Sequence, residues 1–340
     1  MSQILIIYTG GTIGMMTDPV TKTLKPINFE QIMDNVPELE KLNCKIKVHS
    51  FEEIIDSSNM NPAIWSQLAE LIERNYDSVD GFVILHGSDT MSFTASALSF
   101  MLKNLAKPVI FTGSQLPISA IRTDAKENLM TAIEIANAKK GDLARVPEVC
   151  IYFDYKLFRA NRSFKYNSSK FEAFRSPNYP ILAESGVHLR FSVNDIRVPK
   201  PDDKLQVHKN LVSDVAVLKL YPGISPKVVE AVLNAPVRGI VMETFGAGNT
   251  TTDQWFIDLL DAAIQSGKVI LDISQCKVGT VELGRYETSK HLKDIGVANG
   301  YDMTYEAAVT KMMHLLGQLD DPKEIKRLLE TDLRGELTVY

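Results

Sequence analysis

The sequence has few cysteines, no long apolar run and no excess of positive charge. Its three cysteines, Cys44, Cys150 and Cys276, are scattered and form no C-x-x-C pair, which excludes a disulfide framework and a cysteine-based metal site. No apolar stretch approaches a membrane span, and the amino terminus lacks the charged and apolar regions of a signal peptide. The net charge of -5, without a Lys/Arg run, disfavours nucleic acid as a partner. We therefore expect a reduced, soluble, cytoplasmic protein that binds neither membrane nor nucleic acid.

The size and composition indicate a folded protein of two domains. Hydrophobic residues make up 45% and charged residues 23% of the 340 residues, which is an ordinary globular balance. The composition changes near Val198–Lys204, a stretch rich in proline and charge that is typical of a linker or exposed turn. We predict an amino-terminal domain over residues 1–198, a linker over 199–210 and a carboxyl-terminal domain over 211–340.

Short apolar strands alternate with helical segments along the whole chain. Because parallel neighbours need crossover connections, this alternation predicts parallel sheets covered by helices, and so an α/β fold with a large first domain and a smaller second one. The strands expected in the first domain are Gln3–Tyr8, Lys45–Phe51, Gly81–Leu85, Pro108–Thr112 and Val149–Phe153, and those in the second are Val215–Leu220, Gly239–Met242 and Lys268–Ile273.

Polar residues follow the strands of the first domain. The first strand leads directly into Thr9-Gly10-Gly11-Thr12, where two glycines permit a sharp turn and a close approach to a ligand. The carboxyl ends of parallel strands lie on one edge of the sheet, so polar residues there can converge. The residues concerned are Thr12, Ser57, Ser58, Ser88, Asp89, Ser114 and Gln115.

These side chains offer the parts of an acyl-transfer site. A Thr12 or Ser88 hydroxyl is a poor nucleophile until a base or a network removes its proton. Lys165 and Asp89 supply an amine and a carboxylate for such a network, with Ser88 able both to donate and to accept. Backbone N–H groups around Gly10–Thr12, or near Ser88, are candidate donors to an oxyanion.

Each residue also has an ordinary structural interpretation. Asp89 stands where a helix N-cap is common, and a lysine such as Lys165 is usually a solvated charge. His86, at the end of a buried strand, is a candidate base but more typical of a core residue. The Thr9–Thr12 turn by itself is equally a glycine-rich turn or a degenerate nucleotide loop. Together on one sheet edge, these residues favour acyl transfer.

Seven motifs run in order along nearly the whole chain. They are T-G-G-T-I at 9–13, D-S-S-N-M at 56–60, H-G-S-D-T-M at 86–91, T-G-S-Q at 112–115, R-A-N-R-S-F-K at 159–165, S-P-N at 176–178 and G-A-G-N at 246–249. Together they resemble the motifs of the bacterial-type L-asparaginases, and most closely those of the cytoplasmic type I group.

The resemblance implies an activity and its residues. It implies hydrolysis of L-asparagine to L-aspartate and ammonia through a covalent acyl-enzyme, with Thr12 as the nucleophile. By motif position, Ser88, Asp89 and Lys165 form the second catalytic group, and Ser88 and Asp89 also contact the substrate. The remaining substrate-binding residues are Asp56, Ser57 and Ser58, for the α-amino and α-carboxylate groups.

The same resemblance implies the fold and the assembly. It implies a flavodoxin-like amino-terminal α/β domain and a smaller carboxyl-terminal α/β domain, without a metal or an organic cofactor. Members of the family form intimate homodimers and often homotetramers. Asn249 is then expected to reach the substrate site of the neighbouring subunit.

The sequence departs from the family pattern at three points. Ser88 stands where a threonine is usual, which keeps the hydroxyl but leaves χ1 less restrained. Residues 15–28, expected to form a lid or a surface connection, contain no tyrosine to assist Thr12. Leu24 is the corresponding residue, and Tyr301 or Tyr305 is an alternative source of that group. Glu243 occupies the place of an arginine linked to allosteric control, so we predict no such allostery.

Two other functions compete with an asparaginase. The asparaginase-like subunit of a tRNA-dependent amidotransferase normally carries an additional amino-terminal domain, whereas here the first motif begins at residue 9. An amino-acid sensor of the same fold is expected to lack the nucleophile or the lysine. Asparagine and glutamine differ by one methylene, a discrimination of about 1–3 kcal/mol that the sequence does not settle.

Overall fold

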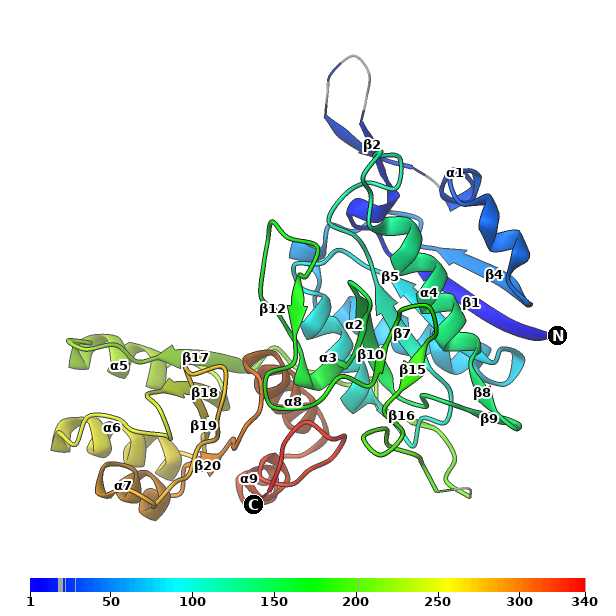
Figure 1. Cartoon of the computed structure of the whole chain (residues 1–340). Coiled ribbons are helices and arrows are strands. Elements are labelled where there is room, and N and C mark those ends of the chain that lie inside the picture. Colours follow the sequence, from blue (N-terminus) through cyan, green and yellow to red (C-terminus); the bar gives the residue numbers. More distant parts are fainter. Residues whose placement is uncertain (18–20, 22, 28, 201, 340) are drawn as a thin grey trace. The chain divides into compact units, whose positions relative to one another are not determined.

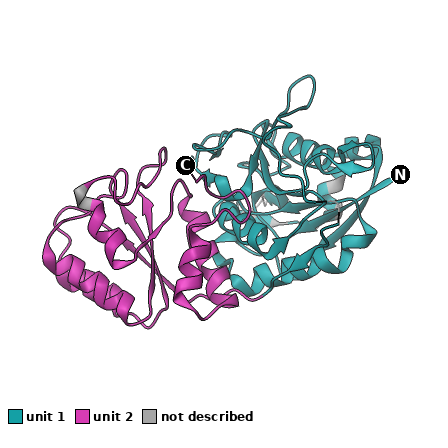
Figure 2. Ribbon diagram, turned by 90° about the horizontal axis from the view of Figure 1, so that it is seen from below, with its two compact units in different colours: residues 1–209 teal, residues 210–340 magenta. Residues whose placement is uncertain are grey.

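The computed structural model describes residues 1–340 except 18–20, 22, 28, 201 and 340. The chain forms two compact units, Met1–Lys209 and Asn210–Tyr340, which Figure 2 shows in different colours. Part of the predicted linker is strand β16 (Gln206–Val207), which pairs with β6 (Leu102–Lys103) of the first unit. In the described ranges, no helix is both long enough and apolar enough to cross a membrane.

The first unit is built on an eight-stranded sheet (Figure 1). Its parallel strands are β1 (Ser2–Tyr8), β4 (Cys44–Ser50), β5 (Gly81–Leu85), β7 (Val109–Thr112) and β10 (Val149–Phe153). Their order β4-β1-β5-β7-β10 is 2-1-3-4-5 in sequence, so the predicted flavodoxin-like arrangement is confirmed. Beyond β10 follow the antiparallel strands β11 (Lys156–Arg159), β14 (Ala183–Glu184) and β15 (Arg190–Phe191).

Helices cover both faces of this sheet. Helices α1 (Phe29–Asp34) and α4 (Ala125–Asn137) share one core with the inward residues of β1. Helices α2 (Pro62–Asn75) and α3 (Met91–Met101) are joined on the other face by a hydrogen bond from Trp65 Nε1 to Thr94 Oγ1. Both α3 and α4 link neighbouring strands in the same direction across the sheet. Because they lie on opposite faces, their two crossovers have opposite handedness.

The helix boundaries follow from local chemistry. Helix α2 begins at Pro62, because Asn61 Oδ1 accepts from the backbone N–H groups of Ala63 and Ile64 and proline occupies the first turn. Helix α3 ends at Met101, since the next two residues form β6 and Asn104 has a left-handed φ of 61°. The other short strands are β2 (Met15–Thr17), β3 (Leu24–Pro26), β8 (Lys139–Lys140), β9 (Leu143–Ala144), β12 (Phe164–Lys165) and β13 (Phe174–Arg175).

Strands β2 and β3 pair antiparallel within residues 15–28, the segment expected to form a lid or a surface connection. Residues 18–20, 22 and 28 of that segment lie outside the described part of the chain.

The second unit contains a four-stranded parallel sheet. Its strands, in spatial order, are β17 (Val215–Lys219), β18 (Gly239–Thr244), β19 (Val269–Ser274) and β20 (Ala298–Asn299). Helices α5 (Pro226–Leu233), α6 (Gln254–Gln265) and α7 (Glu287–Ile295) share one core on this sheet, and α8 (Tyr305–Gln318) and α9 (Pro322–Leu329) also pack on it. Helix α7 was not predicted, because its apolar stripe is short and its composition is mainly polar.

A fully buried ion pair fixes the last residues of the chain. Lys311 Nζ lies 2.5 Å from Glu336 Oε1, and both side chains are 0% exposed. Nζ also donates to the carbonyls of Leu329 and Thr331, at the end of α9. Burial alone raises the pKa of Glu336, but Lys311 and two backbone N–H groups lower that pKa to about 2. The pair therefore joins α8, the end of α9 and the carboxyl-terminal segment.

We predict that Lys311→Met lowers the free energy of unfolding by about 3–5 kcal/mol, because it leaves a buried carboxylate without its cation. Adding Glu336→Gln should recover much of that loss. The exposed pair Arg327–Glu324 provides the control, and Arg327→Met should change stability little. Urea unfolding monitored by circular dichroism measures each variant. A cost for Lys311→Met no larger than that of the control would contradict the assigned role.

Candidate active site

Three polar loops pack backbone against backbone at the carboxyl edge of the large sheet. A Cβ at Gly11 would lie 2.6 Å from the backbone nitrogen of Gly87, and a Cβ at Gly87 would lie 2.6 Å from Ser57 Oγ. A Cβ at Gly10 would lie 2.3 Å from the carbonyl oxygen of Ile55. Gly10 and Gly11 also have φ values of 139° and 94°, which side chains rarely adopt. Glycine at these positions therefore lets the loops after β1, β4 and β5 meet.

Hydrogen bonds join the same three loops. Thr9 donates to the carbonyl of Leu85 from its backbone nitrogen at 3.0 Å and from Oγ1 at 2.8 Å. The backbone N–H of Ile55 donates to the carbonyl of Thr9 at 2.8 Å. Thr90 Oγ1 donates to the carbonyl of Ser57 at 2.6 Å. The polar residues that follow these strands thus gather on one sheet edge, as the alternation of strands and helices indicated.

The structure brings Ser88, Asp89 and Lys165 together. Lys165 Nζ donates to Ser88 Oγ at 2.8 Å and to Asp89 Oδ1 at 2.6 Å. The Lys165 side chain is 16% exposed, so it is not an ordinary solvated charge, while Asp89 is 66% exposed. Asp89 does not cap α3, whose N-cap residue is Thr90. The group places a cation and a carboxylate next to a hydroxyl, an arrangement able to hold and move a proton.

A separate network holds the segment that leads to Lys165. Arg159, at the end of β11, makes two bonds to Glu148, from Nε at 2.6 Å and from an Nη at 3.1 Å. Both side chains are buried, and the Arg159 guanidinium stacks 4.2 Å from the Tyr179 ring centroid. Two residues later, Asn161 Nδ2 donates to Ser99 Oγ of α3 at 3.2 Å. The first residues of the R-A-N-R-S-F-K motif therefore anchor the strand that carries its lysine.

Thr12 and the Asp56–Ser58 segment lie on the two loops beside Ser88. Thr12 begins the short 3₁₀ turn Thr12–Gly14 and is half-buried. Asp56 caps the turn Ser57–Asn59 by accepting from the Ser58 backbone N–H at 2.9 Å. Asp56 and Ser58 are exposed, whereas Ser57 is only 3% exposed and faces Gly87. In this segment Asp56 and Ser58 therefore present their side chains to solvent, and Ser57 serves the packing of the loops.

His86 is a core residue with both ring nitrogens bonded. Its Nδ1–H donates to the carbonyl of Gly87 at 2.6 Å, and Nε2 accepts from Thr94 Oγ1 at 2.9 Å. Thr94 Oγ1 in turn accepts from Trp65 Nε1. Burial lowers the pKa of His86 to about 4, so the ring is neutral at physiological pH. His86 thus supports the loop that carries Ser88, as expected for a core histidine.

The sequence analysis missed two residues that hold the loop after β7. Asp124 accepts from the backbone N–H groups of Gln115 and Leu116, and Asn128 Nδ2 donates to the carbonyl of Gly113 at 2.9 Å. Asn128, the fourth residue of α4, is 1% exposed. A polar residue within the apolar stripe of a helix was the available signal, because a buried amide needs partners.

Asn249 and the alternative tyrosines belong to the second unit. Asn249 follows β18 in a loop with left-handed glycines, Gly246 (φ 53°) and Gly248 (φ 99°). Its backbone N–H donates to the carbonyl of Phe245 at 2.8 Å. Burial raises the pKa of both Tyr301 and Tyr305. This loop thus presents Asn249 at the carboxyl end of the smaller sheet.

Buried polar groups of β18 and β19 pack against the G-A-G-N loop. Asp272 of β19 accepts from Thr244 Oγ1 at 2.7 Å, and a Cβ at Gly248 would lie 2.9 Å from the other Asp272 oxygen. Burial raises the pKa of Asp272 to about 8, which favours a neutral carboxylic acid. Glu243, the residue in place of the allosteric arginine, is buried and lies 3.3 Å from Lys219 Nζ.

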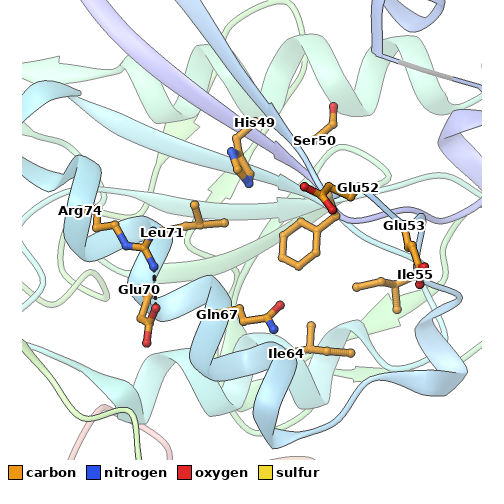
Figure 3. Close-up of a pocket in the computed structure, with 11 residues that line it drawn as sticks. His49, Ser50, Glu52, Glu53, Ile55, Ile64, Gln67, Glu70, Leu71 and Arg74 are labelled. Atoms are coloured by element: carbon orange, nitrogen blue, oxygen red, sulfur yellow. Dashed lines mark hydrogen bonds and ion pairs between the residues drawn. The ribbon is translucent and has the colours of Figure 1, made fainter.

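A cavity of about 610 Å³ lies between α2 and the chain that follows β4 (Figure 3). Its apolar wall includes Ile64 and Leu71, and its rim includes the Glu70–Arg74 ion pair, 2.7 Å long. None of the predicted site residues lines it, although Ile55, next to Asp56, does. The candidate active site is therefore the loop edge and not this cavity.

We predict that Gly87→Ala destabilises the protein by about 1–3 kcal/mol, because the added methyl group meets Ser57 in a closely packed site. Gly87 has no left-handed φ, so the variant tests the steric contact alone. Gly186→Ala is the matched control, since nothing lies within 4 Å of its Cβ position. Thermal and urea unfolding of both variants measure the difference. Equal stability of the two variants would show that the loops can separate without cost.

We also predict a pH dependence that arises from His86. The pKa of His86 is lowered to about 4 in the folded state, so the unfolded state binds more protons between pH 6.5 and pH 4. The free energy of unfolding therefore falls as the pH decreases through this range, by roughly 3 kcal/mol from this group. His86→Gln should reduce that slope, and the exposed His49→Gln should not. Identical slopes for both variants in urea titrations at several pH values would argue against the buried neutral ring.

The sequence and the fold match known proteins over almost their whole length. The family model described as Asparaginase, N-terminal, matches residues 3–197, and that of the Glutaminase/Asparaginase C-terminal domain matches residues 214–329. The chain is 40% identical over 339 residues to L-asparaginase 1 of Escherichia coli K12, covering 99% of this chain and 98% of the relative.

Two solved structures have the same fold. L-asparaginase I from Vibrio cholerae matches with a TM-score of 0.90 and 39% identity, covering 99% of each chain. The thermostable L-asparaginase from Thermococcus kodakarensis matches with a TM-score of 0.90 and 30% identity, covering 99% of this chain and all of that one. The resemblance carried by the seven motifs is confirmed, and the chain belongs to the asparaginase family.

Proposed function

We propose that this chain is an amidohydrolase that converts L-asparagine and water to L-aspartate and ammonia through an acyl-enzyme on Thr12. The observation that carries the proposal is the meeting of Ser88, Asp89 and Lys165 beside the loop that bears Thr12. The relatives named above are L-asparaginases, which supports asparagine as the substrate.

In the first step, the Thr12 hydroxyl attacks the carbonyl carbon of the side-chain amide, and the hydroxyl proton passes to a base. The tetrahedral intermediate collapses, the C–N bond breaks, and the amide nitrogen leaves as ammonia after it takes up a proton. The product is an ester between Thr12 and the aspartyl side chain. Backbone N–H groups of the Gly10–Thr12 turn or near Ser88 are the proposed donors to the oxyanion.

In the second step, water attacks the ester and releases aspartate and Thr12. The Ser88–Lys165–Asp89 group is proposed to relay the proton of that water to the Thr12 oxygen as this oxygen leaves the ester. Lys165 suits this role because its side chain is only 16% exposed and its Nζ lies 2.8 Å from Ser88 Oγ. Asp89 fixes the direction of the amine.

The substrate's charged end is proposed to bind at Asp56, Ser58 and Asp89. The exposed carboxylates of Asp56 and Asp89 suit the α-ammonium group, and the Ser58 hydroxyl suits the α-carboxylate. Ser57 then acts through the loop backbone, since its side chain is buried against Gly87.

We further propose a cytoplasmic homodimer or homotetramer in which Asn249 completes the site of a neighbouring subunit. The resemblance to the type I group supports the assembly, and the unpaired cysteines support a reducing compartment. Analytical ultracentrifugation tests the assembly. Mixing inactive Thr12→Ala protein with inactive Asn249→Ala protein tests the shared site, because hybrid assemblies should regain activity if Asn249 acts across subunits.

We predict that Thr12→Ala and Lys165→Met each fold but lose turnover of asparagine by a factor on the order of 10³ or more. The double variant should be hardly worse than either, because residues of one catalytic unit are not additive. Exposed Lys140→Met is the control for removal of a lysine. Ammonia release from L-asparagine and L-glutamine, measured over a range of concentrations, provides the assay.

Near-normal activity of Thr12→Ala would exclude Thr12 as the nucleophile. Binding of asparagine without ammonia release by the unmodified protein would instead favour a sensor.

A further inference from the structure

The side chain of Gln115 connects the two partners of the Ser88–Lys165 pair. Its Oε1 accepts from Ser88 Oγ at 3.4 Å, and its Nε2 donates to the carbonyl of Lys170 at 2.9 Å. Lys170 lies in the hairpin loop between β12, which carries Lys165, and β13. The Gln115 amide group therefore contacts the Ser88 hydroxyl directly. It also binds the backbone of the hairpin that carries Lys165.

The backbone of Gln115 is itself firmly held. Its N–H lies 2.9 Å and 3.1 Å from the two carboxylate oxygens of Asp124, which also accepts from Leu116. Asp124 is the residue before α4, and Asn128, the fourth residue of α4, donates to the carbonyl of Gly113. Hydrogen bonds to a carboxylate are stronger than bonds between neutral groups. The side-chain amide of Gln115 therefore extends from a firmly held backbone.

The hydrogen-bond directions at Ser88 are defined by its neighbours. The Lys165 ammonium has only donors, so Ser88 Oγ accepts from it. The hydroxyl hydrogen of Ser88 is then left for another acceptor, and Gln115 Oε1 occupies that position. The bond is long, which is common for bonds of a catalytic site before substrate is bound.

A serine at this position needs such a partner more than a threonine would. The γ-methyl group of threonine restricts χ1, whereas the serine hydroxyl has access to all three staggered rotamers. In the rotamer seen here, Ser88 Oγ lies 2.8 Å from Lys165 Nζ and 3.4 Å from Gln115 Oε1.

We propose that Gln115 is a positioning residue that holds the Ser88 hydroxyl in the rotamer facing Lys165, in place of the restraint that a threonine methyl group provides. This inference rests on the proposed function of Ser88 and Lys165 in hydrolysis.

A double-mutant cycle with Gln115→Met and Ser88→Thr tests the proposal. Gln115→Met keeps the length of the side chain and removes both hydrogen bonds. With serine at position 88, it should lower kcat for asparagine about fivefold, the effect of one neutral hydrogen bond, with little change in KM. With threonine at position 88, the same substitution should lower kcat less than about twofold, since χ1 of threonine is already restricted.

The control variant is Gln67→Met, an exposed glutamine of α2 that should leave both parameters unchanged. Unfolding temperatures of all variants establish that a lower kcat does not reflect a smaller folded fraction. An equal loss in the serine and threonine backgrounds, a loss confined to KM, or no loss at all would each overturn the proposal.

Crystal structures of the variants give a second readout that needs no turnover. Gln115→Met should show Ser88 in more than one rotamer, and Ser88→Thr/Gln115→Met should show one. A single, unchanged Ser88 rotamer in Gln115→Met would overturn the positioning role even if activity fell. If the unmodified protein released no ammonia, the proposed function would fail, while the rotamers would still decide what Gln115 does.

Discussion

Close contact between backbone segments at one edge of the large sheet is the constraint on which the candidate site depends. The loops after β1, β4 and β5 approach so closely that Gly11, Gly87 and Ser57 leave no space for another side-chain carbon between them. Atoms within a protein interior are packed at crystal-like density, so a shift of one loop displaces the next. The positions of Thr12, Asp56 and Ser88 are therefore set together and not one by one.

The lysine reaches this edge from outside the parallel sheet. Lys165 is carried by the β12–β13 hairpin, and the bonds of Arg159 to Glu148 and of Asn161 to Ser99 fix the chain just before it. A charge this well enclosed is costly unless it is paired, and here both Asp89 and Ser88 accept from it. The same network that pairs this partly buried cation is the group proposed to transfer protons.

Other buried polar groups serve the structure and not the chemistry. His86 is neutral and has both nitrogens bonded, which fixes the carbonyl of Gly87 next to Ser88. In the second unit, Lys311 and Glu336 hold the chain end against α8. Burying such groups costs desolvation, but each of them defines one geometry for the backbone that it binds.

The class of fold and most of the candidate residues could be predicted from the amino-acid sequence. An apolar run such as Gly81–Leu85 depends on local chemistry, and the structure has this strand where predicted. The convergence of the polar loops also followed from sequence, because parallel strands place their carboxyl ends on one edge. Helix α7 and the antiparallel strands β11 and β14 were not predicted, since their sequence patterns are short and their stability comes from neighbours distant in sequence.

Which side chains meet, by contrast, depends on the tertiary structure. Ser57 and Ser58 are adjacent and alike in sequence, yet packing against Gly87 buries one and leaves the other exposed. Asp89 had the sequence position of a helix cap, but the hairpin brings it a lysine instead. Gln115 and Asp124 acquire their roles only through contacts between separate loops. Local sequence sets the conformation of each segment, whereas these contacts depend on how segments far apart in the chain are packed together.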